Sequence, residues 1–440
     1  MWPYHPALLA RPVPRYTSYP TAAEFGDQVA HGDMVTAIEA VGADTPVSLY
    51  LHIPYCHEIC WYCGCNTGAA NRTARLDSYL ARLHAEIDLF ARHLAGRGRI
   101  RRIAFGGGSP NAIAPTAFVA LVAHLRTAFL CDDAVLSLEL DPRGFDADWA
   151  AVIGEVGVER VSLGVQTFDP GLQAAIGRVQ PQEQVVRSVE LLRAAGVASI
   201  NFDLMYGLPR QDAGRLERTL EQTLALAPER LAVFGYAHVP HLIPRQRRID
   251  AASLPGAAER FAQAALAHDW LTAAGYRPVG FDHFARPDDP LAQAAAKGEL
   301  RRNFQGFTDD PAEILLGLGA SAISAFPDRL LQNAKKAGEW HESIRAGRFA
   351  TERGLHRDLL DQQRGDLIAD ILCRGVAEIG NLPGRELIRE RLDRFEQVGL
   401  IAWQDWQLRL ADDALPYARS IAAMFDAWRS EDEQRFSQAV

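Results

Sequence analysis

Residues 50–66 read Tyr-Leu-His-Ile-Pro-Tyr-Cys-His-Glu-Ile-Cys-Trp-Tyr-Cys-Gly-Cys-Asn, and they hold four of the six cysteines of the chain. Cys56, Cys60 and Cys63 have the spacing Cys-x3-Cys-x2-Cys. Three thiolates on one short loop can bind three irons of a cubane cluster and leave the fourth iron open, as a catalytic zinc keeps one open position. The spacing therefore predicts an iron–sulfur cluster that takes part in chemistry, with these three cysteines as its ligands.

Two other uses of clustered cysteines fit this stretch less well. A disulfide needs an oxidising compartment, nothing else in the chain indicates secretion, and cysteines this crowded would strain one another. Structural zinc needs a second ligand pair about 12 to 20 residues further on, and none follows. With Tyr62 before the third cysteine, the spacing resembles the signature of radical S-adenosylmethionine (SAM) enzymes, whose cluster is of the 4Fe-4S type.

The remaining cysteines are expected to play other parts. Cys65 breaks the spacing and is predicted not to bind the cluster, while Cys131 and Cys373 read as buried apolar residues. The chain is otherwise of ordinary globular composition, with 440 residues of which 48% are hydrophobic. That length allows two to three domains, or one barrel with additions.

Charge and hydropathy exclude several classes of function. A formal net charge of −9 argues against non-specific binding to nucleic acid or to an anionic membrane, so an anionic substrate must meet locally placed Arg or Lys. The N-terminus has no basic region followed by an apolar run, and no window approaches about 18 uninterrupted apolar residues. We therefore expect a cytoplasmic protein, in which thiolates stay reduced.

From Val47 onward, short apolar runs alternate with amphipathic helical patterns. Six strand–helix units are expected, with strands at 47–53, 102–105, 135–140, 159–165, 198–204 and 230–236, and helices at 75–95, from 115, near 146–156, and at 181–195, 212–226 and 257–274. This alternation predicts an α/β fold with a parallel sheet covered by helices, either doubly wound or closed into a barrel.

Polar residues stand at the carboxyl ends of the expected strands and help to choose between these folds. They are Cys56 to Cys63, Gly106 to Ser109, Glu139 with Asp141, Gln166, Asp203, and Tyr236 with His238. In a barrel all of these ends converge on one mouth, where barrel enzymes place their chemistry. The pattern therefore favours a barrel or part of one. The radical SAM resemblance adds that it is a partial, three-quarter parallel β/α barrel.

The chain divides into three predicted regions. Residues 1–46 form a Pro-rich N-terminal arm whose stretch 15–22 is too polar and aromatic for a simple linker, so it is expected to pack across something. Residues 47–334 hold the barrel and its extension, in which loops rich in ligand-recognising side chains follow Gly275. Residues 335–440 are expected to form a smaller, mostly helical, winged-helix-like domain with one hairpin turning at Gln404-Asp405.

Each polar motif at the mouth has a structural as well as a functional interpretation. Gly106-Gly-Gly-Ser109 lacks the Lys of a P-loop and the spacing of a dinucleotide fingerprint, so alone it is no more than a candidate tight turn. Glu139, Gln166, Arg178 and Asp203 could each be solvated loop residues. Gathered at one mouth, they suit a ligand with an ammonium, a carboxylate and ribose hydroxyls, because acids accept from ammonium and ribose and Arg forks onto carboxylate.

Nearly end to end, the chain resembles the oxygen-independent coproporphyrinogen III oxidase (coproporphyrinogen dehydrogenase) family of radical SAM enzymes. The resemblance is carried by the arm Arg15-Tyr-Thr-Ser-Tyr-Pro-Thr-Ala22, the cysteine loop, Gly-Gly-Gly-Ser-Pro110, Glu-Leu-Asp-Pro-Arg143, Gly164-Val-Gln, Asp203-Leu-Met-Tyr-Gly-Leu-Pro209, Tyr236-Ala-His-Val-Pro240 and Asp282-His-Phe-Ala-Arg-Pro-Asp-Asp289. Ser109 stands where the family more often carries Thr, and the hydroxyl is kept.

The resemblance implies that two SAM molecules bind at one site. By motif position the cluster-bound molecule contacts Tyr50, Gly107, Glu139 and Ile323, and of these Tyr50 and Glu139 are assigned to catalysis. The second molecule contacts Tyr62, Gly108, Ser109, Gln166, Arg178, Asp203 and Ala237.

The implied reaction converts two propionates of neighbouring pyrrole rings of coproporphyrinogen III to vinyls by oxidative decarboxylation, giving protoporphyrinogen IX in anaerobic haem biosynthesis. A 5′-deoxyadenosyl radical takes a hydrogen from each propionate β-carbon, and carbon dioxide and one electron then leave. The resemblance also implies an electron donor such as flavodoxin or ferredoxin, a monomer, and neither nucleic acid nor membrane as partner. Arg286 and Arg302 are candidates for docking the substrate carboxylates.

Three alternatives come from other classes of function. A haem-trafficking chaperone or a haem-degrading methyltransferase of the same superfamily would handle porphyrin without this decarboxylation. The chaperones typically begin at the cysteine motif and carry Phe where Cys65 stands, so the arm and Cys65 both favour the oxidase. Nucleic-acid binding through the winged-helix-like tail rests on fold analogy alone and meets an acidic chain.

Overall fold

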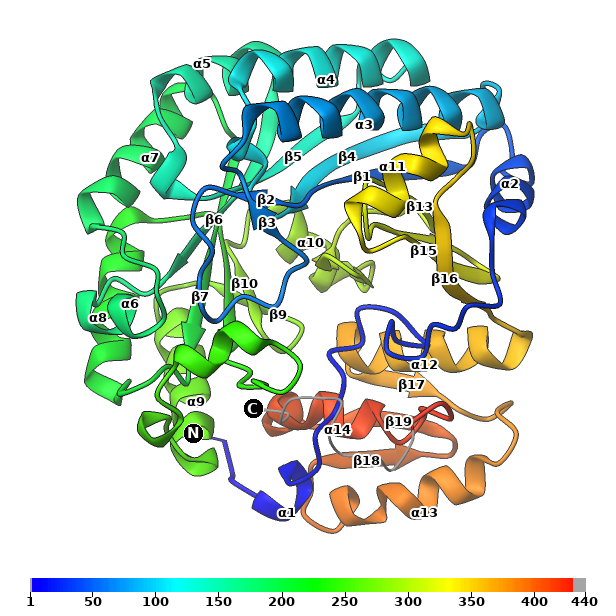
Figure 1. Cartoon of the computed structure of the whole chain (residues 1–440). Coiled ribbons are helices and arrows are strands. Elements are labelled where there is room, and N and C mark those ends of the chain that lie inside the picture. The colour runs from blue at the N-terminus through cyan, green and yellow to red at the C-terminus, as the bar shows by residue number, and fades with distance from the viewer. Residues whose placement is uncertain (1, 430–440) are drawn as a thin grey trace.

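A computed structural model of the chain describes residues 2–429, and its main feature is one large curved sheet. The described chain gives this sheet twelve strands in the order β16-β15-β14-β13-β1-β4-β5-β6-β7-β8-β10-β9. Neighbouring strands from β13 to β8 are parallel, and the strands at both ends are antiparallel. Figure 1 shows the helices α3 to α9 around the outside of this sheet, as expected for a partial β/α barrel.

The six predicted strand–helix units are present, with bounds within a few residues of those expected. The strands are β1 (Pro46–Ile53), β4 (Arg99–Gly107), β5 (Val135–Leu140), β6 (Val158–Gln166), β7 (Ser199–Tyr206) and β8 (Arg230–Gly235), and the helices are α3 (Thr73–Leu94), α4 (Pro115–Phe129), α5 (Ala147–Val156), α7 (Gln182–Ala194), α8 (Ala213–Leu226) and α9 (Ala257–Ala273). Short elements β2 (Tyr55–Cys56), β3 (Gly68–Ala69) and α6 (Pro170–Ala175) lie between them.

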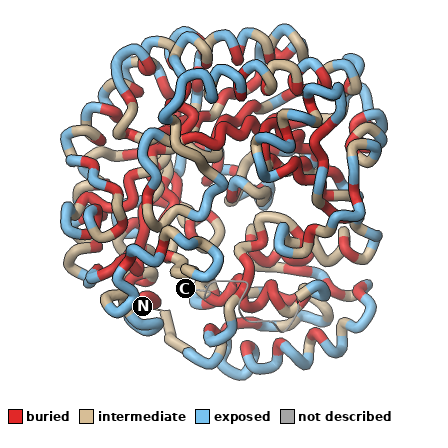
Figure 2. The backbone as a smooth tube through the Cα atoms, viewed as in Figure 1, coloured by how far each residue is buried: buried red, intermediate tan, exposed pale blue. Residues whose placement is uncertain are grey.

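Local sequence signals explain where these helices begin and end. Asp146 caps α5 by accepting from the backbone N–H of Trp149, and the helix stops at Gly157, whose φ is 74°. Asp212 caps α8 in the same way through the N–H of Arg215. Figure 2 shows buried backbone concentrated along the strands and exposed backbone on the outer helices.

The expectation of loops after Gly275 is wrong, because most of this region is regular structure. It contains β9 (Arg277–Val279), β10 (His283–Ala285), α10 (Pro290–Lys297), β11 (Arg301–Asn303), β12 (Gly306–Thr308), β13 (Ile314–Leu318), β14 (Ile323–Phe326) and β15 (Arg329–Asn333). Strand β13 runs parallel to β1 and is buried at every position. Such a strand has no apolar–polar alternation, and glycine interrupts it because a Cβ on Gly317 would lie 2.5 Å from the carbonyl oxygen of Ile323.

The C-terminal part contains the predicted hairpin. Its elements are α11 (Ala337–Arg345), β16 (Thr351–His356), α12 (Leu359–Arg374), β17 (Val376–Glu378), α13 (Arg385–Glu396), β18 (Ile401–Gln404), β19 (Gln407–Leu410), η5 (Asp412–Tyr417) and α14 (Ala418–Ala422). Strands β18 and β19 pair antiparallel, and β17 adds a third strand. The main sheet continues to β16, and the division of the chain into domains near residue 335 stays a prediction; residues 430–440 lie outside the described part.

The N-terminal arm, with α1 (Pro6–Leu9) and α2 (His31–Glu39), runs between the barrel and the C-terminal part (Figure 1). Tyr16 and Tyr19 are buried there. The hydroxyl of Tyr16 donates to Asp426 at 3.0 Å, and that of Tyr19 accepts from the N–H of Ala427 at 3.1 Å. The expectation that the arm packs across another part of the chain is confirmed. No helix within residues 2–429 has the length and apolar character to cross a membrane.

Candidate active site

The cysteine loop lies between β1 and α3, and neighbouring loops fix its backbone. The N–H of Trp61 donates to the carbonyl of Ile176 at 3.1 Å, and the amide of Gln246 donates to the carbonyl of Tyr62 at 2.9 Å. Strand β2 places Cys56 at the start of the loop, Cys60 is buried, and Cys63 is half-buried. The loop is therefore held from two sides.

Two guanidinium groups contact the sulfur of Cys60. Arg143 donates to this sulfur at 3.3 Å and Arg178 at 3.2 Å. Both cations also pair with Asp141, at 2.6 Å and 3.1 Å. Burial raises the pKa of the Asp141 carboxyl, but the charges of Arg178 and Arg143 outweigh burial and hold that pKa below its usual value. This ion-pair network joins the ends of β5 and β6 to the cysteine loop.

The donor set fits an iron–sulfur cluster. Within residues 2–429 every cysteine is a free thiol, and no three His, Cys, Asp or Glu side chains lie close enough to bind a single metal ion. A cubane cluster makes a different demand, because each of its three thiolates binds a different iron. Burial raises the pKa of Cys56 to about 12, and the charge of nearby Cys63 adds to this rise; binding to iron would replace the thiol proton.

A cavity of about 610 Å³ opens beside the loop and has room for a nucleoside-sized ligand. Its lining includes Tyr50, His52, Gly107, Glu139 and Gln332. Burial raises the pKa of Tyr50 well above its usual value, with the charge of Glu139 as the second cause, so the phenol stays protonated. Burial also lowers the pKa of His52 to about 4, so this ring is neutral near pH 7.

The glycine run after β4 brings backbone close to this cavity. Gly107, whose φ is 109°, donates its N–H to Glu139 at 3.2 Å. A Cβ on Gly106 would lie 2.6 Å from that carboxylate, and one on Gly108 would lie 2.5 Å from the carbonyl oxygen of Tyr55. The run is therefore glycine because side chains would collide with the cysteine loop and with β5, a reason more specific than a tight turn.

Glu139 and Asp203 are neighbouring acids inside the barrel. Burial, followed by the charge of Asp203, raises the pKa of Glu139 to about 7. Asp203 accepts hydrogen bonds from Ser162 at 3.0 Å and Asn201 at 2.9 Å. Near neutral pH the Glu139 carboxyl is thus close to half-protonated and can bind either a donor or an acceptor.

The structure brings most of the predicted SAM-contacting residues to one end of the barrel. Tyr50, Gly107 and Glu139 line the same cavity, whereas Ile323 lines a different one beneath the arm, of about 360 Å³. Gln246 bridges Tyr62 and Ala237 by donating to both carbonyls, at 2.9 and 3.0 Å.

The remaining predicted contacts follow the glycine run and β6. Ser109 follows Gly108 and hydrogen-bonds Asn111 through its hydroxyl. Gln166 ends β6 at a register shift with φ 66°. Arg178 is buried, and its donors are taken by Asp141, Cys60 and the carbonyl of Gly164.

Sequence reasoning assigned no role to several residues that shape the site. His52 is two residues from Tyr50 on β1, so the alternation of a strand gave a signal for it. Arg143 and Asp141 lie within a motif quoted above, but their convergence on Cys60 depends on tertiary contacts. Gln246 belongs to no recognisable sequence motif, so no local signal could have identified it.

The two arginines considered for carboxylate docking differ in position. Arg286 donates to the carbonyl of Ala227 at 3.1 Å. Arg302 lies beneath the arm and donates to the carbonyls of Arg15 and Tyr16 at 3.0 and 3.1 Å.

Comparison with known proteins agrees with this geometry. The model of the radical SAM superfamily matches residues 50–223, which span the cysteine loop and the strands β1 to β7. Fold, cysteine loop and match together define the class of the protein as radical SAM.

The oxygen-independent coproporphyrinogen III oxidase of Bradyrhizobium diazoefficiens is 42% identical over 97% of this chain and 97% of its own length. The enzyme of the same name from Pseudomonas aeruginosa is 39% identical over 97% and 96%. The solved structure of coproporphyrinogen III oxidase from Escherichia coli, described as a radical SAM enzyme, superposes with a TM-score of 0.90 at 33% identity and covers 97% of this chain and 100% of its own. The chain belongs to the oxygen-independent coproporphyrinogen III oxidase family.

Proposed function

We propose that this protein oxidatively decarboxylates two propionates of coproporphyrinogen III to vinyl groups and so produces protoporphyrinogen IX in anaerobic haem biosynthesis. The observation that carries this proposal is the cysteine loop beside a glycine cradle and a cavity of about 610 Å³, on a chain similar along 97% of its length to enzymes of that name. No observation favours the haem-trafficking or methyltransferase alternatives.

Cys56, Cys60 and Cys63 would hold a 4Fe-4S cluster, and the adjoining cavity would hold SAM. When bound, the pair supplies one-electron reduction and abstraction of a hydrogen atom from a propionate β-carbon. The contribution of the chain is to fix the positions of both groups and to exclude water and oxygen. Gly107 would offer backbone to the amino acid end of SAM, and Glu139 would accept from its ammonium.

Two SAM molecules per chain are part of the proposal. Its support is that three of the residues assigned to the second molecule come from the β6–β7 part of the barrel: Gln166 ends β6, Arg178 is buried after α6, and Asp203 lies within β7. Arg178 would give up its contacts with Asp141 in favour of a carboxylate of the ligand. In the described structure these donors are already paired, so such binding must compensate for that loss.

Tyr50 and Glu139 are the residues proposed to act at the reacting end. The raised pKa of Tyr50 keeps its hydroxyl protonated, and this hydroxyl lies 3.2 Å from the Nδ1 of His52. Glu139, with a pKa near 7 caused first by burial, can accept from an ammonium without carrying a full buried charge beforehand.

Substrate would enter the barrel interior, where a second cavity of about 370 Å³ lies next to Glu139 and Asp203. Electrons would come from a separate protein such as flavodoxin or ferredoxin, docking where Ile59 of the cysteine loop is 37% exposed. That the protein is a monomer stays a prediction. The cytoplasmic location stays a prediction.

Anaerobic incubation of cluster-reconstituted protein with coproporphyrinogen III, SAM, dithionite and a one-electron acceptor, which takes the electron that leaves with each carbon dioxide, tests the proposed function. The mass of the tetrapyrrole product should fall by two carbon dioxides and four hydrogens. An unchanged tetrapyrrole mass alongside an intact cluster would contradict the proposal, and a methylated or ring-opened product would favour the methyltransferase.

A further inference from the structure

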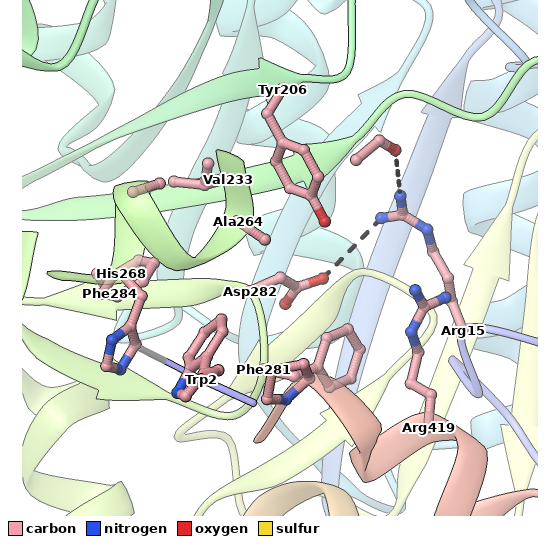
Figure 3. A pocket seen from close by; sticks show the side chains of 13 residues that line it. Trp2, Arg15, Tyr206, Val233, Ala264, His268, Phe281, Asp282, Phe284 and Arg419 are labelled. Carbon is pink, nitrogen blue, oxygen red and sulfur yellow. Dashed lines mark hydrogen bonds and ion pairs between the residues drawn. The ribbon is translucent and has the colours of Figure 1, made fainter. Parts of the chain in front are cut away.

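A small pocket lies where three distant parts of the chain meet. It has a volume of about 40 Å³ and is lined by the arm, by β7, β8 and the segment that leads into β10, by α9, and by the beginning of α14. Figure 3 shows the guanidinium groups of Arg15 and Arg419 turned toward each other and toward Asp282, with Phe281 next to Arg419 and Trp2 next to His268 on the other side of the pocket. A space of this size holds a few water molecules, and it would take a carboxylate head but not a pyrrole ring.

Positive charge exceeds negative charge around this pocket. Arg15 lies 3.9 Å from Asp282 and donates to the carbonyl of Gly235 at 3.1 Å. Arg302 donates to the carbonyl of Arg15 at 3.0 Å, and Arg419 packs over the ring of Phe281 at 5.3 Å. Arg15 and Arg419 thus line the pocket with one carboxylate, Asp282, and Arg302 lies behind Arg15, close enough for its charge to act on Asp282 and Arg419.

Asp282, the acid beside these arginines, already has another partner. Asp282 pairs with the ring of His283 at 2.6 Å. Burial raises the pKa of Asp282, but the charge of His283 and its hydrogen bond outweigh burial and hold the pKa at about 2. Asp282 therefore stays ionised at neutral pH and neutralises at most one of the cations around it.

Arg419 is a buried cation with a nitrogen that lacks a hydrogen-bond partner. Its side chain is buried, with the residue only 8% exposed, and its Nη1 has no hydrogen-bond partner. Nη1 of Arg302 is likewise buried without a partner. Burial, followed by the charge of Arg15, lowers the pKa of Arg419 to about 10, so the group is still charged at neutral pH. A buried cation without a partner is costly unless an anion completes it.

We infer that Arg15, Arg302 and Arg419 form a docking site for a propionate carboxylate of the tetrapyrrole substrate, and that this carboxylate is one of the two that the reaction leaves intact. This inference rests on the proposed function. Coproporphyrinogen III carries four propionates, of which only two react, so the other two can anchor the ring through both decarboxylations. Guanidinium groups bind carboxylates through paired, charge-assisted hydrogen bonds.

The position of these arginines supports this assignment. Arg15 packs over Phe234 at 5.0 Å and Arg302 over Phe307 at 4.4 Å, and both rings line the interior cavity of about 370 Å³. The arginines therefore stand directly behind the aromatic wall of the proposed substrate space. Glu139 and Asp203 also line that cavity and would repel a carboxylate, which leaves the guanidinium groups for the anchoring propionates.

The test measures binding of coproporphyrin III, the oxidised and fluorescent form of the ring, to cluster-bearing protein by fluorescence titration. Arg419→Gln should raise Kd by about 10- to 100-fold, the range for loss of a hydrogen bond to a charged group. The Kd of Arg419→Lys should lie between those of the parent and of Arg419→Gln, because lysine keeps the charge but cannot form the paired hydrogen bonds of a guanidinium. The matched control is Arg391→Gln on exposed α13, which should leave Kd unchanged.

Protoporphyrin IX distinguishes the retained carboxylates from the reacting ones, since it keeps only the former. Arg419→Gln should weaken its binding by the same factor as that of coproporphyrin III. If Arg419→Gln has the parental Kd for both porphyrins and only a lower Tm, the inference is wrong. The three arginines would then serve only to hold the arm in place. If Arg419→Gln does not hold its iron–sulfur cluster, Arg15→Gln replaces it with the same expectation.

The parent protein separates failure of this inference from failure of the proposed function. A parent that neither binds coproporphyrin III nor converts the porphyrinogen would refute the function itself. A parent that does both, alongside an Arg419→Gln variant with the parental Kd, would refute only the docking site.

Discussion

The guanidinium of Arg178 donates to the sulfur of Cys60 across 3.2 Å, although 118 residues separate them in sequence. This contact ties the loop after α6 to the cysteine loop. Arg178 also pairs with Asp141 at 3.1 Å. Its side chain therefore contacts a proposed cluster ligand and also belongs to the proposed second SAM site.

Replacing Arg178 tests the second SAM molecule. Arg178→Gln should keep the cluster but bind one SAM per chain instead of two in equilibrium dialysis. Loss of a charged hydrogen-bond pair from a buried site costs about 2 to 5 kcal/mol, which weakens binding roughly 30-fold to several thousand-fold. Arg187→Gln, on the exposed side of α7, is the control. Two molecules bound to the Arg178 variant would show that the residue has only its structural role.

The ligand assignment predicts separate behaviour for the four cysteines of the loop. Cys56→Ser, Cys60→Ser and Cys63→Ser should each abolish the brown absorbance near 400 nm of the reconstituted protein, because three thiolates are needed to hold a cubane with one open iron. Cys65→Ser should keep that absorbance. Loss of the cluster in Cys65→Ser together with its survival in Cys56→Ser would make the assignment wrong.

The glycine cradle should tolerate no side chain. In Gly108→Ala the new Cβ would lie 2.5 Å from the Tyr55 carbonyl oxygen and 2.6 Å from its nitrogen, so the backbone beside the cluster must move. We expect SAM binding, measured by dialysis, to be lost. Gly338→Ala at the start of α11 meets nothing within 4 Å and should be neutral or stabilising by up to about 1 kcal/mol. Equal SAM binding by both variants would contradict the cradle.

A buried acid outside the site predicts a pH dependence of stability. Glu86 on α3 is fully buried and accepts from the N–H of Gly319 at 2.6 Å and from Asn333 at 2.8 Å. Burial raises its pKa from 4.5 to about 7. Between those values the native state holds a proton that the unfolded state has released, so the stabilisation is complete below pH 4.5 and is lost as pH rises to about 7.

Glu86→Gln should lack this dependence. The difference in unfolding free energy between the parent and the variant, from denaturant titrations at pH 5, 6, 7 and 8, should fall as pH rises to 7 and then level off. Glu299→Gln, an exposed acid, serves as control. A parent–variant difference that stays constant from pH 5 to 8 would mean that Glu86 is ionised in the folded protein throughout.

The sequence predicted the repeating part of the fold well. Helix α3 shows one apolar face with Leu80, Leu83 and Ile87 buried, and such periodicity depends only on local geometry. Strand β13 was missed because a strand buried on both faces has no alternation, and Gly317 obscures it further. Its place beside β1 is fixed by pairing across more than 250 residues, which no local pattern records.

The residues of the candidate site also differ in whether a local pattern could reveal them. Cys56, Cys60 and Cys63 could be found from spacing because one short loop carries them. The arginines on Cys60, and the meeting of Arg15 with Arg419, could not be found in this way, because the arm, the barrel and the C-terminal helix supply them separately. Their convergence appears only when the chain is folded.

The most direct test of the central claim uses coproporphyrinogen III deuterated at the propionate β-carbons. The reconstituted protein is incubated anaerobically with this substrate, SAM and dithionite, and the 5′-deoxyadenosine formed is weighed by mass spectrometry. The deoxyadenosine should carry deuterium in proportion to the vinyl groups formed, and Cys60→Ser should form neither product. Vinyl formation with undeuterated deoxyadenosine, or with none, would contradict it.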